Sequence, residues 1–223
     1  DPYTPGSKPI KRTALGRVRH EGATTALTAD GRLVVYSGDD QADQFVYRFV
    51  TKDKCDSQNR AANKDILDQG TLSVARYDSD GTMRWLPLIH GQGPLTKENG
   101  FDSQADVLIE TRKAAKLLGA TPMDRPEDAE TNPVTGRVYV MLTNNKERSK
   151  PNEANPRPNN IHGHIIEMTP PDVGGKVDHG ADVYQWDVFL KGGNPEMEKV
   201  NAKYHEQVTE HGWLSCPDNC TFD

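Results

Sequence analysis

The residues best suited to chemistry lie between Ala120 and Asn145, where acidic side chains, an arginine, a tight turn and an apolar strand follow one another closely. Asp124, Arg125, Glu127, Asp128 and Glu130 fall within one short segment. Two carboxylates a few Å apart repel by about 4 kcal/mol at an effective dielectric of 20, so a partly buried acidic cluster needs a cationic partner. Arg125 or a metal ion would serve. The other interpretation is a solvated acidic loop with a local Asp/Arg pair.

Three further patterns carry side chains that ligate metals. Asp39, Asp40 and Asp43 follow a predicted strand, and we interpret them as second-rank calcium candidates or as a solvated turn. Asp78-Ser79-Asp80-Gly81 resembles the start of a calcium loop but has no Glu at the twelfth position, which favours a hairpin turn. His162-Gly163-His164 would leave one ion short of ligands, so a role at the start of a strand is favoured.

The amino-acid composition indicates a turn-rich β protein and argues against binding to nucleic acid or a membrane. The 223 residues have a net charge of -6 and 34% hydrophobic residues, with 19 Gly and 15 Pro spread along the chain, as in a turn-rich β protein. The charge argues against a nucleic-acid partner. No stretch approaches 18 consecutive apolar residues, and the first residues lack an apolar signal core, so we expect neither a membrane span nor a signal peptide. We also expect a monomer.

The three cysteines, Cys55, Cys216 and Cys220, match no zinc pattern. Their odd number leaves either one Cys216–Cys220 bridge and a free thiol or three thiols.

Regular strands separated by glycine turns predict an all-β fold. Gly31, Gly81 and Gly136 are spaced about 50 to 55 residues apart, and each precedes an apolar strand, which suggests propeller blades. Three to four blades would make a partial ring. The strands are expected at residues 15–27, 33–36, 45–50, 71–77, 83–89, 138–142, 163–168 and 183–190.

We expect one domain over residues 1–223 with two additions to the strands. Residues 51–69 are polar without an apolar period and are interpreted as a surface insertion. Ser103–Asp106 resembles a capping box, and the apolar stripe after it predicts one long helix over 104–118, closed by Gly119.

The order of several motifs resembles the PhoX-type alkaline phosphatases, nearly from end to end. The sequence DRPED followed by N-P-x-T-G-x-V-Y-V-x-L-T-N-N is the most specific part. The segments that carry the resemblance are residues 19–21, 36–40, 45–49, 70–77, 123–128, 142–145, 155–157, 162–166 and 217–219.

The resemblance implies a six-bladed propeller, export by the twin-arginine route, hence a periplasmic or secreted protein, and hydrolysis of phosphomonoesters at iron and calcium ions. Glu21 and Glu127 match carboxylate metal ligands of the family. Arg125 matches the arginine that holds the substrate phosphate, and Asn219 matches an asparagine that contacts it. The chemistry agrees, because hard cations take carboxylate oxygens and a planar guanidinium can bind two phosphate oxygens.

One departure is as informative as the matches. The family's iron-ligating cysteine belongs to a Cys-Glu-Glu segment upstream of the first matched strand, and nothing of that kind precedes Glu21 here. We therefore expect an incomplete iron site, a chain that is the middle of such an enzyme, and poor hydrolysis by the 223 residues alone. The expected function is a metal-dependent phosphomonoesterase. The alternative is a non-catalytic calcium-binding β-propeller.

Overall fold

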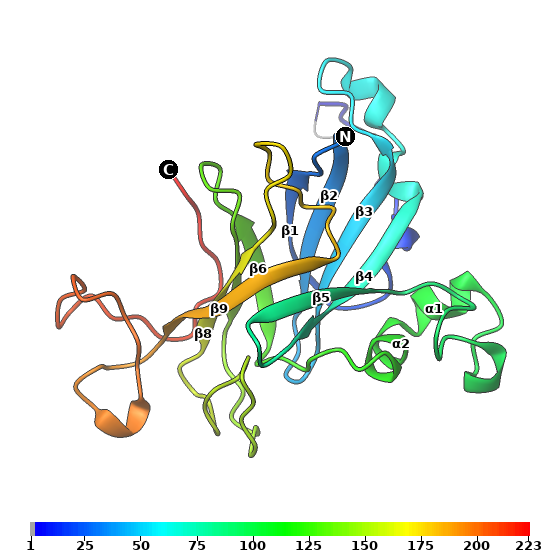
Figure 1. The fold of residues 1–223 in the computed structure, drawn as a ribbon. Coiled ribbons are helices and arrows are strands. Elements are labelled where there is room, and N and C mark those ends of the chain that lie inside the picture. Colours follow the sequence, from blue (N-terminus) through cyan, green and yellow to red (C-terminus); the bar gives the residue numbers. More distant parts are fainter. Residues whose placement is uncertain (1–2) are drawn as a thin grey trace.

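Antiparallel strands make up most of the regular structure in residues 3–223, which the computed structural model describes (Figure 1). Hairpin turns at Thr28–Gly31 and Asp78–Gly81 close as predicted, each with the glycine N–H donating to the carbonyl three residues earlier. The strands are β1 (His20–Leu27), β2 (Arg32–Asp39), β3 (Val46–Lys54), β4 (Gly70–Tyr77), β5 (Thr82–Pro87), β6 (Pro126–Thr131), β7 (Val138–Leu142), β8 (His164–Thr169) and β9 (Val183–Lys191).

The strands form one nine-stranded sheet in the order β1-β2-β3-β4-β5-β9-β8-β7-β6. β1 to β5 and β6 to β9 are two meanders, and the pairing of β5 with β9 joins them. The sheet curves until β6, at one end, lies against β1 and β2 at the other, as Figure 1 shows. This arrangement confirms the predicted all-β, propeller-like fold class. How many blades a complete ring would contain stays a prediction.

The inner face of the curved sheet holds one hydrophobic core to which eight strands contribute. Tyr36, Trp85 and Tyr184 lie at its centre with their rings in tilted or edge contact. The Tyr36 and Tyr184 hydroxyls are 2.8 Å apart, and the Tyr36 hydroxyl also lies 2.9 Å from Nδ1 of His179. The two tyrosine hydroxyls, one from β2 and one from β9, are therefore paired across the core and link the two meanders.

The outer face of β2 to β4 is covered by two short helices, α1 (Gln104–Ile109) and α2 (Thr111–Leu117). The prediction of one long helix over 104–118 is wrong, because the backbone turns away at Glu110 (φ -99°, ψ 40°). The backbone N–H of Arg17 donates to the Leu108 carbonyl, and its Nε donates to the Ile109 carbonyl. These contacts occupy carbonyls that a continuous helix would use. The predicted cap forms at Ser103, whose hydroxyl accepts from the Asp106 N–H, while the Asp106 carboxylate accepts from the Ser103 hydroxyl and the Asp102 N–H.

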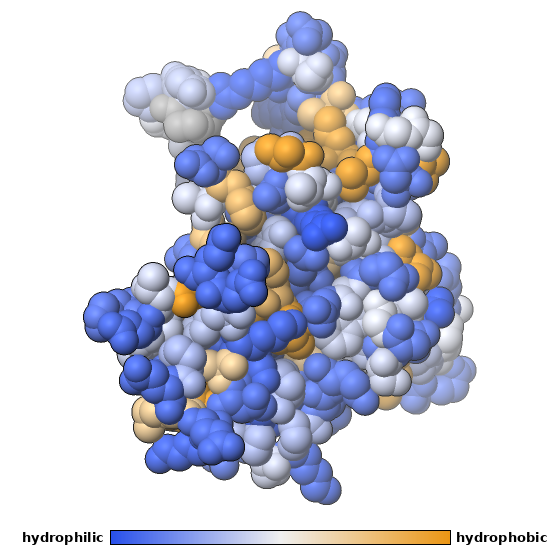
Figure 2. Space-filling model, turned by 60° about the vertical axis from the view of Figure 1, so that its left-hand side comes forward, coloured by the Kyte–Doolittle hydropathy of each residue, from blue (hydrophilic) through white to orange (hydrophobic). Residues whose placement is uncertain are grey.

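The remaining segments are loops with single turns of 3-10 helix. β3 extends to Lys54, four residues into the predicted 51–69 insertion, and the rest of that segment is mostly exposed. Within residues 3–223 no helix is long and apolar enough to cross a membrane. Figure 2 shows a face that is mainly hydrophilic with scattered hydrophobic side chains, as the mean hydropathy of -0.78 predicts. The 3-10 helices are Thr13–Leu15, Arg60–Asn63, Ile66–Asp68, Lys97–Asn99 and Glu198–Val200.

Candidate metal and phosphate site

Three carboxylates from distant parts of the sequence meet where the two ends of the sheet approach each other. Glu21 lies at the start of β1, Glu127 on β6, and Asp218 in the C-terminal segment. Each offers one oxygen, and these oxygens all lie within 4.8 Å of one another. The prediction that Glu21 and Glu127 approach each other is therefore confirmed, whereas their role as metal ligands stays a prediction.

Close contact between β1 and β6 brings the first two carboxylates together. The pairing of β1 with β2 shifts register between Glu21 and Thr24, where Gly22 has a left-handed φ of 66°. A Cβ at Gly22 would lie 2.0 Å from the Asp128 carboxylate and 3.2 Å from its Cα. On β2, a Cβ at Gly38 would lie 2.0 Å from the Glu127 carbonyl oxygen. Two glycines thus allow β6 to approach β1 and β2 closely enough for Glu127 to reach Glu21.

The C-terminal segment is held at the same place by hydrogen bonds to its neighbours. The Thr143 hydroxyl donates to the Pro217 carbonyl at 2.8 Å, and the Asp128 N–H donates to the Asp218 carbonyl at 3.4 Å. Asn219 follows directly and is exposed. This places Asn219 beside the carboxylate cluster, while its predicted contact with a phosphate stays a prediction.

Arg125 lies beside the cluster in an unusual backbone conformation, with a left-handed φ of 58°. Its Nε is 2.7 Å from Oδ1 of Asp40 and 3.0 Å from Oε1 of Glu127. The side chain of Arg125 is 39% exposed, whereas that of Glu127 is 4% exposed. The guanidinium is thus oriented through Nε by two carboxylates and still reaches solvent, as an arginine that receives an anion requires.

Burial disfavours the charged form of Glu127 in this cluster. The pKa of Glu127 is raised to about 7, mainly because burial removes water from the carboxylate. Arg125 and a hydrogen bond from Thr143 lower this pKa, whereas the negative charges of Asp40 and Asp218 raise it further. Asp40 and Glu127 contact the Arg125 guanidinium, and the carboxylates of Glu21 and Asp218 lie close to that of Glu127, so four carboxylates share one arginine. Such a site attracts an additional cation.

Asp39 and Asp40, both predicted as calcium ligands, occupy different places. Asp39 is fully buried, and its carboxylate accepts two hydrogen bonds from Arg112 of α2 and one from the Arg19 N–H. It lies outside the cluster of three carboxylates and forms a structural ion pair that anchors α2 on the sheet. Asp40 faces Arg125 instead. Its carboxylate is near enough to the cluster to influence the pKa of Glu127.

Two features of the site were missed from the sequence. The acidic stretch is a strand, β6, and Asp124 and Glu127 are buried, so the solvated-loop interpretation is wrong for these two residues. Asp218 was passed over as a ligand, although Pro217-Asp218-Asn219 was part of the family resemblance. A carboxylate directly before the assigned Asn219 was the available signal.

The donor set can be tested against the metals implied by the resemblance. Converging carboxylate oxygens, one of them buried with a raised pKa, fit a hard cation such as calcium, held by Glu21, Glu127 and Asp218. Among residues 3–223 no cysteine belongs to this cluster, so the thiolate expected for iron is not supplied by the described chain. Cys220 instead packs beside Phe222 against the outer face of β7 and β8.

The fold and the site together define an all-β, propeller-like protein with an acidic, arginine-containing site between the ends of its sheet. The sequence model of the family described as "Alkaline phosphatase PhoX" matches residues 1–223, and the chain belongs to this family.

A solved structure supports the same assignment. The chain is similar to "Pseudomonas fluorescens PhoX in complex with vanadate, a transition state analogue", with 41% sequence identity and a TM-score of 0.88. The match covers 100% of this chain and 40% of that protein, so the chain spans less than half of its length. No curated protein matched this chain.

Proposed function

We propose that the protein hydrolyses phosphomonoesters with the help of metal ions bound at Glu21, Glu127 and Asp218. The observation that carries the proposal is the convergence of these three carboxylates next to Arg125. Family membership and the similarity to a PhoX solved in complex with vanadate, a transition state analogue, support it. As the resemblance implies, we assign calcium and iron as the cofactors, with the iron site left incomplete by the described residues, and the periplasm or the extracellular medium as the location.

The chain's own residues would bind and orient the phosphate. With Nε of Arg125 held by Asp40 and Glu127, its two terminal amino groups would donate to two phosphate oxygens and hold the phosphate beside the carboxylate cluster. Asn219, beside Asp218, would donate its side-chain amide to a further oxygen. When bound, the metal ions polarise the phosphoryl oxygens and lower the pKa of bound water.

Charge explains why the arginine and the carboxylates must share one site. Without cations the carboxylates would repel an anionic substrate, and Arg125 alone cannot offset four of them. A cation held by Glu21, Glu127 and Asp218 would offset their negative charge, and the field at Arg125 would then favour a phosphate.

The experiment is hydrolysis of p-nitrophenyl phosphate by the intact protein, meaning the full-length enzyme of which residues 1–223 are expected to be the middle part, assayed with its metals, after chelation, and after readdition of calcium and iron. We expect turnover that disappears on chelation and returns with metals. Metal binding without any phosphate release would instead support the non-catalytic calcium-binding propeller.

A further inference from the structure

The irregular chain between β7 and β8 buries more polar side chains than a surface connection requires. It has no strand or helix of its own, yet several of its polar residues are 9% exposed or less. Buried polar groups are costly unless each is hydrogen-bonded, so their partners indicate what the segment is for. These residues are Thr143, Asn145, Arg148, Asn155, Arg157 and Asn160.

Three of these side chains converge on Pro122–Asp124, directly before Arg125. Arg148 donates through Nε to the buried Asp124 carboxylate and through a terminal amino group to the Pro122 carbonyl at 3.0 Å. Asn155 accepts from the Asp124 N–H at 2.9 Å and donates to the same Pro122 carbonyl at 3.0 Å. Asn160 donates to the second Asp124 oxygen at 2.9 Å.

Arg125 gives a reason for this concentration of hydrogen bonds. A left-handed backbone costs a residue other than glycine about 1–2 kcal/mol and persists only where its surroundings impose it. The Arg125 N–H donates back to the Met123 carbonyl at 2.9 Å, and the Met123 N–H donates to Gln44 at 2.8 Å. The backbone is therefore fixed up to the residue whose side chain must point to Asp40 and Glu127.

We infer that Asp124, Arg148 and Asn155 are positioning residues for Arg125. They touch neither the carboxylate cluster nor the place assigned to the phosphate, and they act by holding Pro122–Asp124 so that Arg125 keeps its left-handed conformation. The inference rests on the proposed function, because it assigns the phosphate contact to Arg125. It adds that the segment between β7 and β8 determines the orientation of that contact.

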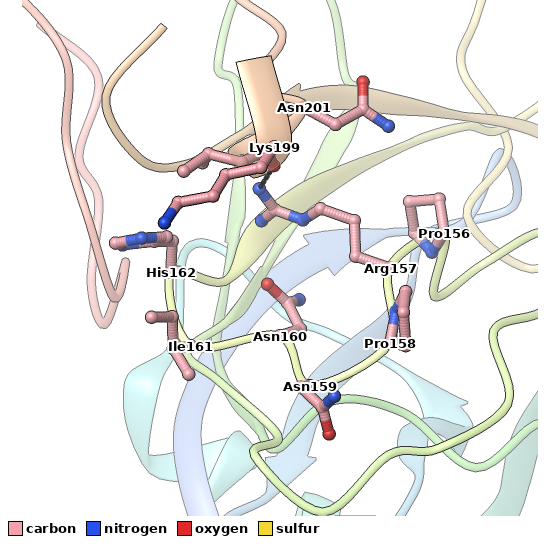
Figure 3. A pocket seen from close by; sticks show the side chains of 10 residues that line it. Pro156, Arg157, Pro158, Asn159, Asn160, Ile161, His162, Lys199 and Asn201 are labelled. Carbon is pink, nitrogen blue, oxygen red and sulfur yellow. Dashed lines mark hydrogen bonds between the residues drawn. The ribbon is translucent and has the colours of Figure 1, made fainter. Parts of the chain in front are cut away.

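Arg157 provides a matched control within the same segment. It is buried to a similar degree as Arg148, but its guanidinium donates to the carbonyls of Gly163, Gly192 and Val200. Figure 3 shows Arg157 reaching toward the turn that contains Lys199. Replacing it disturbs a similarly buried arginine without removing a hydrogen bond to Pro122–Asp124.

The test compares Arg148→Lys with Arg157→Lys in the intact, metal-loaded protein, with Asn155→Ala as a second variant. A lysine keeps the charge but cannot donate to Asp124 and Pro122 in the fixed geometry of the guanidinium fork. We expect Arg148→Lys and Asn155→Ala to lower kcat/KM about 10- to 100-fold with unchanged metal content, since small misplacements of a catalytic group cost up to about 100-fold. Inhibition by inorganic phosphate should weaken in parallel. Arg157→Lys should keep kcat/KM within about threefold.

A double-mutant comparison separates positioning from a general loss of stability. In an Arg125→Ala background, Arg148→Lys should lower kcat/KM no further, because the residue through which it acts is gone. Losses that multiply, or equal losses for Arg148→Lys and Arg157→Lys, would overturn the inference.

A crystal structure of Arg148→Lys gives a readout that does not depend on activity. We expect Arg125 to leave its left-handed φ and its contact with Asp40. If it keeps both, the positioning role is excluded. Should the wild-type protein release no phosphate, the proposed function fails, and the structure of this variant alone decides about positioning.

Discussion

The close approach of β1 and β6 at Gly22 makes a quantitative prediction for Gly22→Ala. A side chain there would adopt a left-handed φ of 66°, at about 1–2 kcal/mol. Its Cβ would also overlap the Asp128 carboxylate and press on the Asp128 backbone, and overpacking adds about 1–3 kcal/mol. We therefore expect the free energy of unfolding to fall by about 2–5 kcal/mol. Because β6 must move, we also expect a 10- to 100-fold loss of calcium affinity, about the scale found when a residue that supports a metal ligand is lost.

Gly31→Ala is the matched control for this substitution. Gly31 lies in the hairpin turn that follows β1, also with a left-handed φ (91°), but a Cβ there meets nothing within 4 Å. We expect it to lose only about 1–2 kcal/mol and to bind calcium like the wild type. Thermal unfolding and calcium titration calorimetry of the intact protein measure both quantities. Equal calcium affinity in the two variants would refute the argument that the β1–β6 contact sets the spacing of Glu21 and Glu127.

Three other predictions concern single side chains. Arg125→Ala should lower kcat about 100- to 1,000-fold while the protein keeps its metals, and unchanged turnover would show that phosphate is held elsewhere. Arg112→Met should lower the free energy of unfolding by about 2–3 kcal/mol, because it leaves the Asp39 carboxylate buried without its arginine. The metal content should not change, and a loss of metal would show that Asp39 is a metal ligand after all. Burial lowers the pKa of His164 from 6.5 to about 4. The stability contributed by the neutral His164 side chain is therefore complete above pH 6.5 and is lost progressively as pH falls toward 4, by at most about 3 kcal/mol. The raised pKa of Glu127 changes the stability of the metal-free protein in the opposite direction, so the wild type must be compared with His164→Gln. The measurement is the free energy of unfolding in urea at pH 7 and pH 5 for both proteins. An identical pH dependence of that free energy in both would contradict the assignment.

The parts of the fold that the sequence predicted are those governed by local patterns. Val138–Leu142 is an uninterrupted apolar run and is a wholly buried strand. β6 escaped prediction because Pro126–Thr131 contains mostly polar side chains, and its burial depends on strands far away in the sequence. The helix break at Glu110 has the same origin, since Arg17 lies 93 residues away and its contacts occupy the carbonyls before the break.

The candidate site was also predicted only where local sequence patterns or the family resemblance reached. The local acidic segment already pointed to Arg125 and Glu127, whereas Glu21 was assigned to the same site only through the family resemblance, because no local pattern links residues so distant in sequence. Asp39 and Asp40 are neighbours in an apparently uniform acidic turn, yet one faces Arg112 and the other faces Arg125. Alternation along the chain explains their opposite directions, but only the positions of the two arginines determine what each carboxylate does.

The central claim is that Glu21, Glu127 and Asp218 together hold the metal beside Arg125. Anomalous X-ray diffraction from crystals of the intact protein with calcium and vanadate tests it most directly. We predict a calcium ion with oxygen ligands from all three carboxylates at about 2.3–2.6 Å, and vanadate oxygens facing the terminal amino groups of Arg125. Calcium bound elsewhere, with these three carboxylates free of metal, would contradict the account.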